Sequence, residues 1–274
     1  MSALSAPPRP LVVYWFRNDL RLHDHPCLTA AIAAAAKASA TFLPVYCLDD
    51  RFLTAPGPSW QCSRSPHGAP GAPFVLRKAG PIRARFLLAS LSSLRSSLEA
   101  RGSGLHVLRG APEERIPALV AELKPSSVSL FGSLETASEE AGVAARLRRR
   151  LPAGAAFSLS PGAASLYAAS ELPFPRDASG AALIPDVCTP FRTRVERELA
   201  VPSPLPPPSG GALRDLPFPA LPATPVPSLA ELGYSAAEAA AGPDPRSAFR
   251  LPAGEKAALR RVEDYFFKED RLKT

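Results

Sequence analysis

The sequence lacks the short glycine-rich motifs that mark the common phosphate sites of α/β proteins. No GxGxxG follows its first strand-like run, and neither GxxxxGK[ST] nor the nucleophile motif GxSxG occurs in its 274 residues. The first two motifs place backbone amides around a phosphate, and the third exposes a serine on a sharp turn. Dinucleotide-dependent enzymes, Walker-type nucleotide hydrolases and serine α/β-hydrolases are therefore unsupported.

No apolar run reaches the ~18 residues that a membrane-spanning helix needs. Cysteines are also few, and they have no CxxC spacing. The four are Cys27, Cys47, Cys62 and Cys188. No signal peptide precedes them, so we expect reduced thiols rather than a disulfide framework or a zinc site. The sequence predicts a soluble intracellular protein without a membrane or metal partner, and it leaves the compartment open.

Proline, by contrast, is abundant, with 33 residues. Because proline is excluded from helix interiors and central strands, much of the chain should be loop. Prolines recur every two or three residues from Val201 to Pro227, a pattern typical of an extended, semi-rigid connector. We therefore predict a disordered tail over residues 1–10, a compact domain over 11–200, a Pro-rich linker over 201–245, and a further helical segment over 246–274.

The net charge is +7. The densest basic run lies within Arg146–Arg150, at the end of a predicted helix, where cations favour the helix dipole. Charge alone does not indicate a nucleic-acid partner.

The first 160 residues alternate strand-like and helix-like blocks. Short apolar strands separated by amphipathic helices are typical of a doubly wound, Rossmann-like α/β fold, here with a five-stranded parallel sheet covered on both faces. The predicted strands are 11–16, 41–47, 105–109, 127–131 and 157–159, and the predicted helices are 26–37, 81–101, 113–123 and 138–150. The insertion that follows Thr54, with Trp60, Cys62 and His67, is predicted to have no regular structure.

In such a sheet, ligands bind beyond the carboxyl ends of the strands where the strand order reverses. With the order 3-2-1-4-5, the first and fourth strands meet there, so Glu135 should lie beside Arg17, with the exit of the second strand next to both. A carboxylate can accept two parallel hydrogen bonds from a ligand that presents an amino group beside a ring N–H. The candidate ligand-binding residues are Glu135, Asn18, Cys47, Leu48, Asp49 and Thr136.

These residues also have structural interpretations. Glu135 could be a loop carboxylate at the start of the next helix. No nucleophile and base pair stands out in the loop from Arg17 to Arg21, so we predict that its arginines and aspartate bridge neighbouring elements. Either Asp24 or His25 is expected to cap the helix after it, and when Asp24 is the cap His23 and His25 are expected in solvent.

Several segments, in order, resemble the amino-terminal domain of the DNA photolyase and cryptochrome family. The segments are WFRNDLR (15–21) with HDHPCL (23–28), LPVYCLDDRFL (43–53), the helix of 77–102, LFGSLETASEE (130–140), ELPFP (171–175) and PDVCTPFRTRVE (185–196). Together they cover about residues 11–274 with a few gaps. The last two, 171–175 and 185–196, are most similar to the DASH cryptochromes.

This resemblance implies an antenna domain in which Glu135 holds 5,10-methenyltetrahydrofolate. For a complete protein, the resemblance implies a helical domain that binds FAD. It also implies one of two functions: photoreduction of cyclobutane pyrimidine dimers, chiefly in single-stranded DNA, or a role as a photoreceptor. Members of the family are often organellar. Two tryptophans, Trp15 and Trp60, are too few for the electron-transfer chain of the family.

The closing segment, 254–274, resembles the lead-in to that helical domain. We expect this chain not to repair DNA by itself, with Tyr265, Phe266 and Phe267 partly exposed and able to self-associate. Two alternatives stay open at this point: a truncated, non-enzymatic binding or regulatory module, and an incomplete gene model.

Overall fold

A computed structural model describes residues 8–53, 78–161, 166–242, 246 and 252–269. The predicted tail lies mostly outside these residues, as do Trp60, Cys62 and His67.

The centre of the molecule is an open, five-stranded parallel sheet with the order β3-β2-β1-β4-β5. The predicted fold class and strand order are confirmed. Every residue of β1 is buried, because this central strand is covered on both faces. The strands are β1 (Leu11–Phe16), β2 (Thr41–Leu48), β3 (His106–Arg109), β4 (Val128–Leu134) and β5 (Ala156–Pro161).

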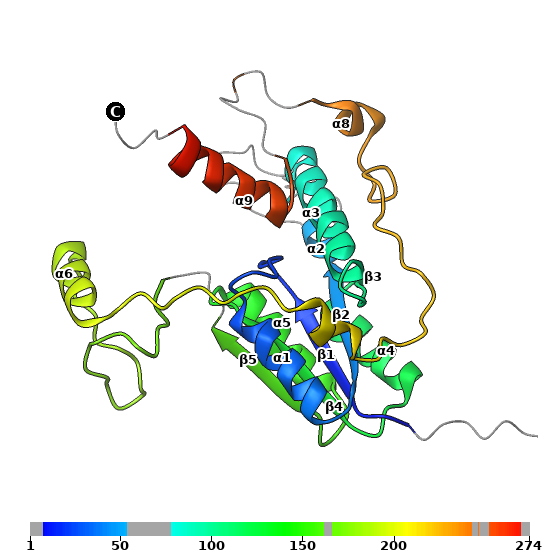
Figure 1. The fold of residues 1–274 in the computed structure, drawn as a ribbon, viewed down its shortest axis with the longest axis horizontal. Coiled ribbons are helices and arrows are strands. Elements are labelled where there is room, and N and C mark those ends of the chain that lie inside the picture. The colour runs from blue at the N-terminus through cyan, green and yellow to red at the C-terminus, as the bar shows by residue number, and fades with distance from the viewer. Residues whose placement is uncertain (1–7, 54–77, 162–165, 243–245, 247–251, 270–274) are drawn as a thin grey trace, which may run out of the picture.

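Helices cover both faces of the sheet (Figure 1). Alternate side chains of β1 enter two separate cores: Val12, Tyr14 and Phe16 pack with the helices of one face, and Leu11, Val13 and Trp15 pack with those of the other. The first face carries α1 (Pro26–Lys37) and α3 (Pro81–Glu99), and the second carries α4 (Pro112–Leu123) and α5 (Ser138–Arg150). Proline at the first position of α1, α3 and α4 fixes where each begins.

Shorter helices occupy the connections. They are α2 (Asp50–Leu53), α6 (Cys188–Glu198), α7 (Gly210–Arg214), α8 (Ala236–Ala240) and α9 (Glu255–Glu263), and a π-helical turn, Asp264–Lys268, follows α9. In Figure 1, α6 stands apart from the layers around the sheet. It is held to its own connection by stacking of Phe191 on Phe174, whose ring centroids are 5.4 Å apart.

The Pro-rich segment after residue 200 packs on the domain that precedes it. Leu213, Leu216, Leu229 and Leu232 belong to the same core as α1 and α3. Tyr234 is buried with them, and its hydroxyl donates a hydrogen bond to the carbonyl of Ala79 at 2.7 Å. The division at residue 200 stays a prediction, but the segment 201–242 completes a core and does more than connect.

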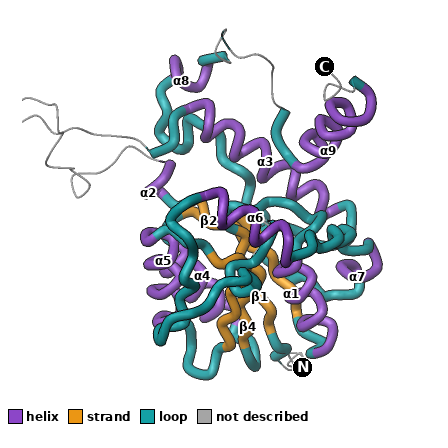
Figure 2. Tube along the Cα trace, turned by 90° about the vertical axis from the view of Figure 1, so that its left-hand side faces the viewer, coloured by secondary structure: helices purple, strands orange, loops and turns teal. Residues whose placement is uncertain are grey.

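The last helix is attached to the loop that follows β1. Glu255, the first residue of α9, accepts hydrogen bonds from the backbone N–H groups of Leu22 and His23 at 2.9 and 2.7 Å. Figure 2 shows α9 beside one end of α3. Phe266 and Phe267 beyond it are exposed, as predicted; self-association through them stays a prediction.

His25, one of the two residues predicted to cap α1, occupies the N-cap position without a capping hydrogen bond from its side chain; the capping role of Asp24 and the solvent position of His25 are wrong. Asp24 has a positive φ of 51° and does not cap α1, because its carboxylate accepts a hydrogen bond from the backbone N–H of Leu205 at 3.1 Å. His25 is only 1% exposed, and its Nε2 lies 3.0 Å from the Tyr14 hydroxyl. Burial lowers the pKa of His25, which favours a neutral ring in this core.

Candidate ligand-binding cavity

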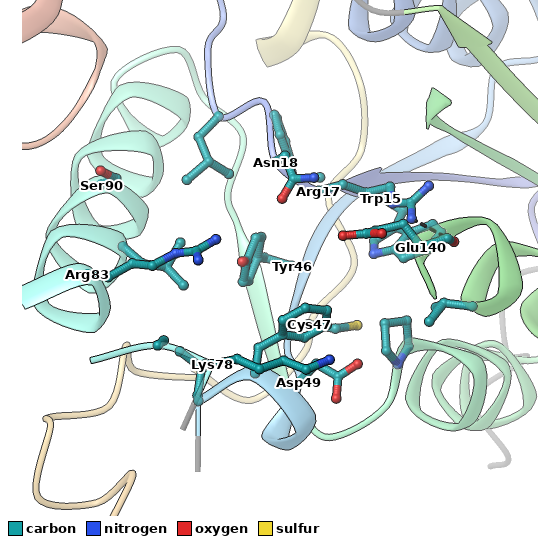
Figure 3. A pocket seen from close by; sticks show the side chains of 18 of the residues that line it. Trp15, Arg17, Asn18, Tyr46, Cys47, Asp49, Lys78, Arg83, Ser90 and Glu140 are labelled. Atoms are coloured by element: carbon teal, nitrogen blue, oxygen red, sulfur yellow. Dashed lines mark hydrogen bonds between the residues drawn. The ribbon is translucent and has the colours of Figure 1, made fainter. Parts of the chain in front are cut away.

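A cavity of about 310 Å³ opens at the carboxyl ends of β1 and β2. Its walls come from the two strand exits, from α2 and α3 on one side, and from the first turns of α4 and α5 on the other. Figure 3 shows the polar side chains around this space. The cavity therefore lies at the edge of the sheet where the sequence predicts a binding site.

Much of the lining is aromatic or aliphatic. Trp15 contributes from β1, Phe52 from α2, Phe86 from α3 and Val143 from α5. Trp15 is 3% exposed, so it serves both the core and the cavity wall. Flat apolar walls of this kind suit a planar ring system.

Arg17 ties the exit of β1 to the exit of β4 and to α5. Its guanidinium donates to the carbonyls of Ser133 and Glu140 at 3.2 and 2.9 Å, and it lies 4.3 Å from the centre of the Trp15 ring. Burial lowers the pKa of Arg17, while the charges of Glu135 and Glu140 oppose that change. The predicted bridging role of this arginine is observed.

The exit of β2 is fixed by a network of charges around the buried carboxylate of Glu113. Asp49 accepts from Arg51 at 2.8 Å, and Arg51 also donates to both carboxylate oxygens of Glu113 at 2.8 and 2.9 Å. Arg146 of α5 donates to the same carboxylate at 2.8 Å. Since this network joins α2, α4 and α5, it holds the cavity walls in one arrangement.

Two titratable groups of β2 face this end of the sheet in neutral form. Burial raises the pKa of the Tyr46 hydroxyl and the pKa of the Cys47 thiol, and nearby acidic groups add to both changes. Both groups stay protonated at neutral pH. An anionic nucleophile is therefore not available from either residue.

A cation closes the side of the cavity where α3 begins. Lys78 lines the cavity, pairs with the carboxylate of Glu139 at 2.5 Å and lies 4.8 Å from the centre of the Phe52 ring. This pair joins the start of α3 to the start of α5. The charge of Lys78 is thereby matched within the protein.

The predicted site residues fall into two groups. Asn18, Cys47 and Asp49 line the cavity, whereas Leu48 is 1% exposed and its side chain belongs to the core of the α1 and α3 face. Glu135 and Thr136 follow β4 and are not part of the cavity lining. Glu135 is half-buried and close enough to Arg17 to act on its charge, so its role in ligand binding stays a prediction.

The sequence did not single out Tyr46, Arg83 or Ser90, which also line the cavity. Tyr46 directly precedes Cys47 at the exit of β2, and this position in the sequence is enough to predict that it lies near the cavity. Arg83 and Ser90 lie on α3, whose approach to the sheet depends on tertiary packing, so the sequence pattern carried no signal for them.

Among the described residues, no group of three or more His, Cys, Asp or Glu side chains is arranged to hold a metal ion. Over the same residues, none of the helices is long and apolar enough to cross a bilayer.

Comparison with known proteins gives a consistent set of relatives. The family model described as DNA photolyase matches residues 12–209. A Cryptochrome DASH from Gloeobacter violaceus is 38% identical over 96% of this chain and 46% of its own length. The Oryza sativa protein described as Cryptochrome DASH, chloroplastic/mitochondrial, is 32% identical over 96% of this chain and 43% of its own.

Solved structures agree with the sequence matches. The crystal structure of the Synechocystis sp. PCC6803 cryptochrome superposes with a TM-score of 0.73 at 28% identity, over 98% of this chain and 48% of that one. A class III photolyase from Agrobacterium tumefaciens shares the fold, with a TM-score of 0.61 at 24% identity. The chain thus spans about half the length of the relatives it matches.

Proposed function

Because the chain belongs to the DNA photolyase family, we propose that it is the antenna domain of a DASH-type cryptochrome or photolyase and that it binds 5,10-methenyltetrahydrofolate. The observation that carries this proposal is the cavity at the exits of β1 and β2. It lies at the carboxyl edge of the sheet, next to the reversal of strand order between β1 and β4 where ligands of doubly wound sheets bind.

The dimensions and chemistry of the cavity fit part of such a ligand. Its volume of about 310 Å³ is at the lower end of small-molecule sites, which is enough for a fused ring but not for a whole folate. Trp15, Phe52 and Phe86 supply apolar walls, and Asn18 and Asp49 supply polar groups. A folate bound here would have its ring system enclosed and its tail directed outward.

Glu135 would recognise the pterin edge from the neighbouring exit of β4. The charge of its carboxylate raises the pKa of Arg17, so the two groups are close, and Arg17 lines the cavity. The bound folate would supply absorption in the near-UV and blue. The protein residues would hold the ring, exclude water around it and fix its orientation.

For a protein that joins this domain to a flavin-binding helical domain, we propose the wider activity of the family. The folate would pass excitation energy to FAD, and the flavin would drive photoreduction of cyclobutane pyrimidine dimers in single-stranded DNA or signal the presence of blue light. The name of the rice relative makes a chloroplast or mitochondrion the compartment to examine first.

The test is a titration of the purified chain with 5,10-methenyltetrahydrofolate, followed by absorption. Two variants examine the two ends of the proposed site: Glu135→Gln at the exit of β4, and Ser90→Leu, which places a larger side chain in the cavity from α3. Glu122→Gln, an exposed position on α4, is the matched control for the loss of one carboxylate.

We expect a saturable folate band in the wild type and in Glu122→Gln. Glu135→Gln should bind at least about tenfold more weakly, because a charge-assisted hydrogen bond contributes about 1.5–3 kcal/mol and about 1.4 kcal/mol is a factor of ten. Ser90→Leu should lose binding with an unchanged circular dichroism spectrum. A wild-type chain that shows no saturable band contradicts the proposal, and wild-type affinity in a folded Ser90→Leu variant contradicts the assignment to this cavity.

A further inference from the structure

Helix α9 is attached to the rest of the described structure through its first turn. No residue of α9 is buried, and its apolar side chains Leu259 and Val262 are 48% and 47% exposed. At its start, by contrast, one carboxylate oxygen of Glu255 accepts hydrogen bonds from the backbone N–H groups of both Leu22 and His23. The position of α9 therefore depends on a few contacts at one end.

These contacts reach two walls of the cavity. Gly254, just before α9, lies so close to α3 that a Cβ there would clash with the side chain of Ser93. Ser93 is about one turn beyond Ser90 of α3, which lines the cavity. Leu22 closes the loop that follows β1, and Leu20 of the same loop also lines the cavity. The start of α9 thus joins the α3 wall to the loop wall.

The carboxylate makes this attachment strong and specific. Hydrogen bonds to an ionised acceptor are shorter and stronger than those between neutral groups. Leu22 is 1% exposed, so a displacement of Glu255 would leave a backbone donor in a largely buried position without its acceptor, which is costly. The conformation of the loop and the position of α9 therefore favour each other.

We propose that Glu255 is a positioning residue of the cavity, which holds the loop after β1 so that Asn18 and Leu20 face the ligand. This inference rests on the proposed function. Coupling between two equilibria is reciprocal, so a bound ligand that stabilises the loop also stabilises the attachment of α9. Occupancy of the cavity would thereby hold α9, with its exposed apolar residues, in one place against the α/β domain.

The first measurement is a titration of wild type and three variants with 5,10-methenyltetrahydrofolate, followed by absorption. Glu255→Ala removes the acceptor, and Glu255→Gln keeps one side-chain oxygen that can accept. Glu263→Ala is the matched control, because Glu263 is an exposed carboxylate at the other end of α9. Circular dichroism verifies that the variants fold.

The second measurement needs only the wild type, so it stands even if a variant does not fold. Hydrogen exchange of the Leu22 and His23 amides is followed by NMR with and without the same folate. The control is the amide of Leu199, which donates to the carbonyl of Val195 in α6, away from the cavity. A role of Glu255 confined to stability would leave the exchange of Leu22 and His23 unchanged by the ligand.

We expect Glu255→Ala to bind the folate about fivefold more weakly or worse, which is the lower end of typical coupling between sites. Glu255→Gln should recover part of the affinity, and Glu263→Ala should bind as the wild type does. In the wild type, folate should slow exchange at Leu22 and His23 but not at Leu199.

Two results separate this inference from the proposed function. If the wild type binds folate, and either Glu255→Ala binds equally well or exchange at Leu22 and His23 does not slow, the positioning role of Glu255 is refuted while the antenna function stands. If the wild type does not bind folate, both proposals are refuted.

Discussion

Glu113 gives the sharpest stability prediction, because a buried carboxylate there holds two arginines from different elements. Its side chain is 5% exposed and accepts hydrogen bonds from Arg51 of α2 and Arg146 of α5. Burial alone would raise the pKa of Glu113, but the bonds from Arg51 and Arg146 outweigh burial and lower the pKa from 4.5 to about 2. We expect Glu113→Gln to destabilise the fold at neutral pH.

The magnitude follows from the pKa difference between the folded and unfolded chain. One pKa unit corresponds to about 1.4 kcal/mol, so the change from 4.5 to about 2 limits the contribution of the ionised carboxylate to about 3.5 kcal/mol. Because Arg146 is 40% exposed, solvent screening reduces this value, and we expect a loss of about 1–2 kcal/mol. The folded pKa lies below the unfolded value, so the contribution is complete above pH 4.5 and is lost as the pH falls toward 2.

Urea denaturation of wild type and Glu113→Gln between about pH 7 and pH 3 measures this difference. Glu114→Gln is the matched control on the same helical turn, because Glu114 is 63% exposed and its pair with Arg150 is worth little. The difference between wild type and Glu113→Gln should shrink as the pH falls, while Glu114→Gln stays near wild type throughout. A difference that is independent of pH, or an equal effect of the two substitutions, would refute the assigned role of the carboxylate.

Two further predictions concern backbone conformation and thiol accessibility. Gly102→Ala should lower stability by about 1–2 kcal/mol in thermal unfolding, because Gly102 has a φ of +81° and a Cβ there would lie 2.9 Å from the Cβ of Arg214. Gly154→Ala, at the same φ but in open space, should cost less; equal losses would show that the contact does not matter. A thiol reagent at about pH 8 should label the exposed Cys188 in the folded protein. Cys47, whose pKa is raised by burial, should be labelled only after denaturation. Labelling of Cys47 in the folded protein, seen by mass spectrometry, would contradict its burial.

The fold could be predicted because local signals and the global arrangement agree. The apolar run of β1 is long enough only for a strand, and its two alternating faces fill two cores. Proline marks the first turns of α1, α3 and α4, so the helix starts were fixed to within a residue. The same agreement between levels explains why the strand order matched.

The segment after residue 200 shows what composition leaves undetermined. Its proline content correctly indicated little regular structure, but composition does not report where isolated apolar side chains go. Leu213 and Leu232 are completely buried against the α1 and α3 face, although each lies between exposed neighbours. Their burial depends on a surface built by distant residues, and no local period encodes it.

The residues of the candidate site also differ in whether the sequence could predict their position. Asn18 and Asp49 could be predicted from topology alone, because residues that follow adjacent parallel strands must meet at one edge of the sheet. Arg83 could not, since its position depends on how α3 crosses that edge and on which cations the protein neutralises itself. Within the cavity, Arg17 and Lys78 have protein partners, whereas Arg83 forms no hydrogen bond or ion pair with the described residues, so a count of the cations does not tell which of them is open to a ligand.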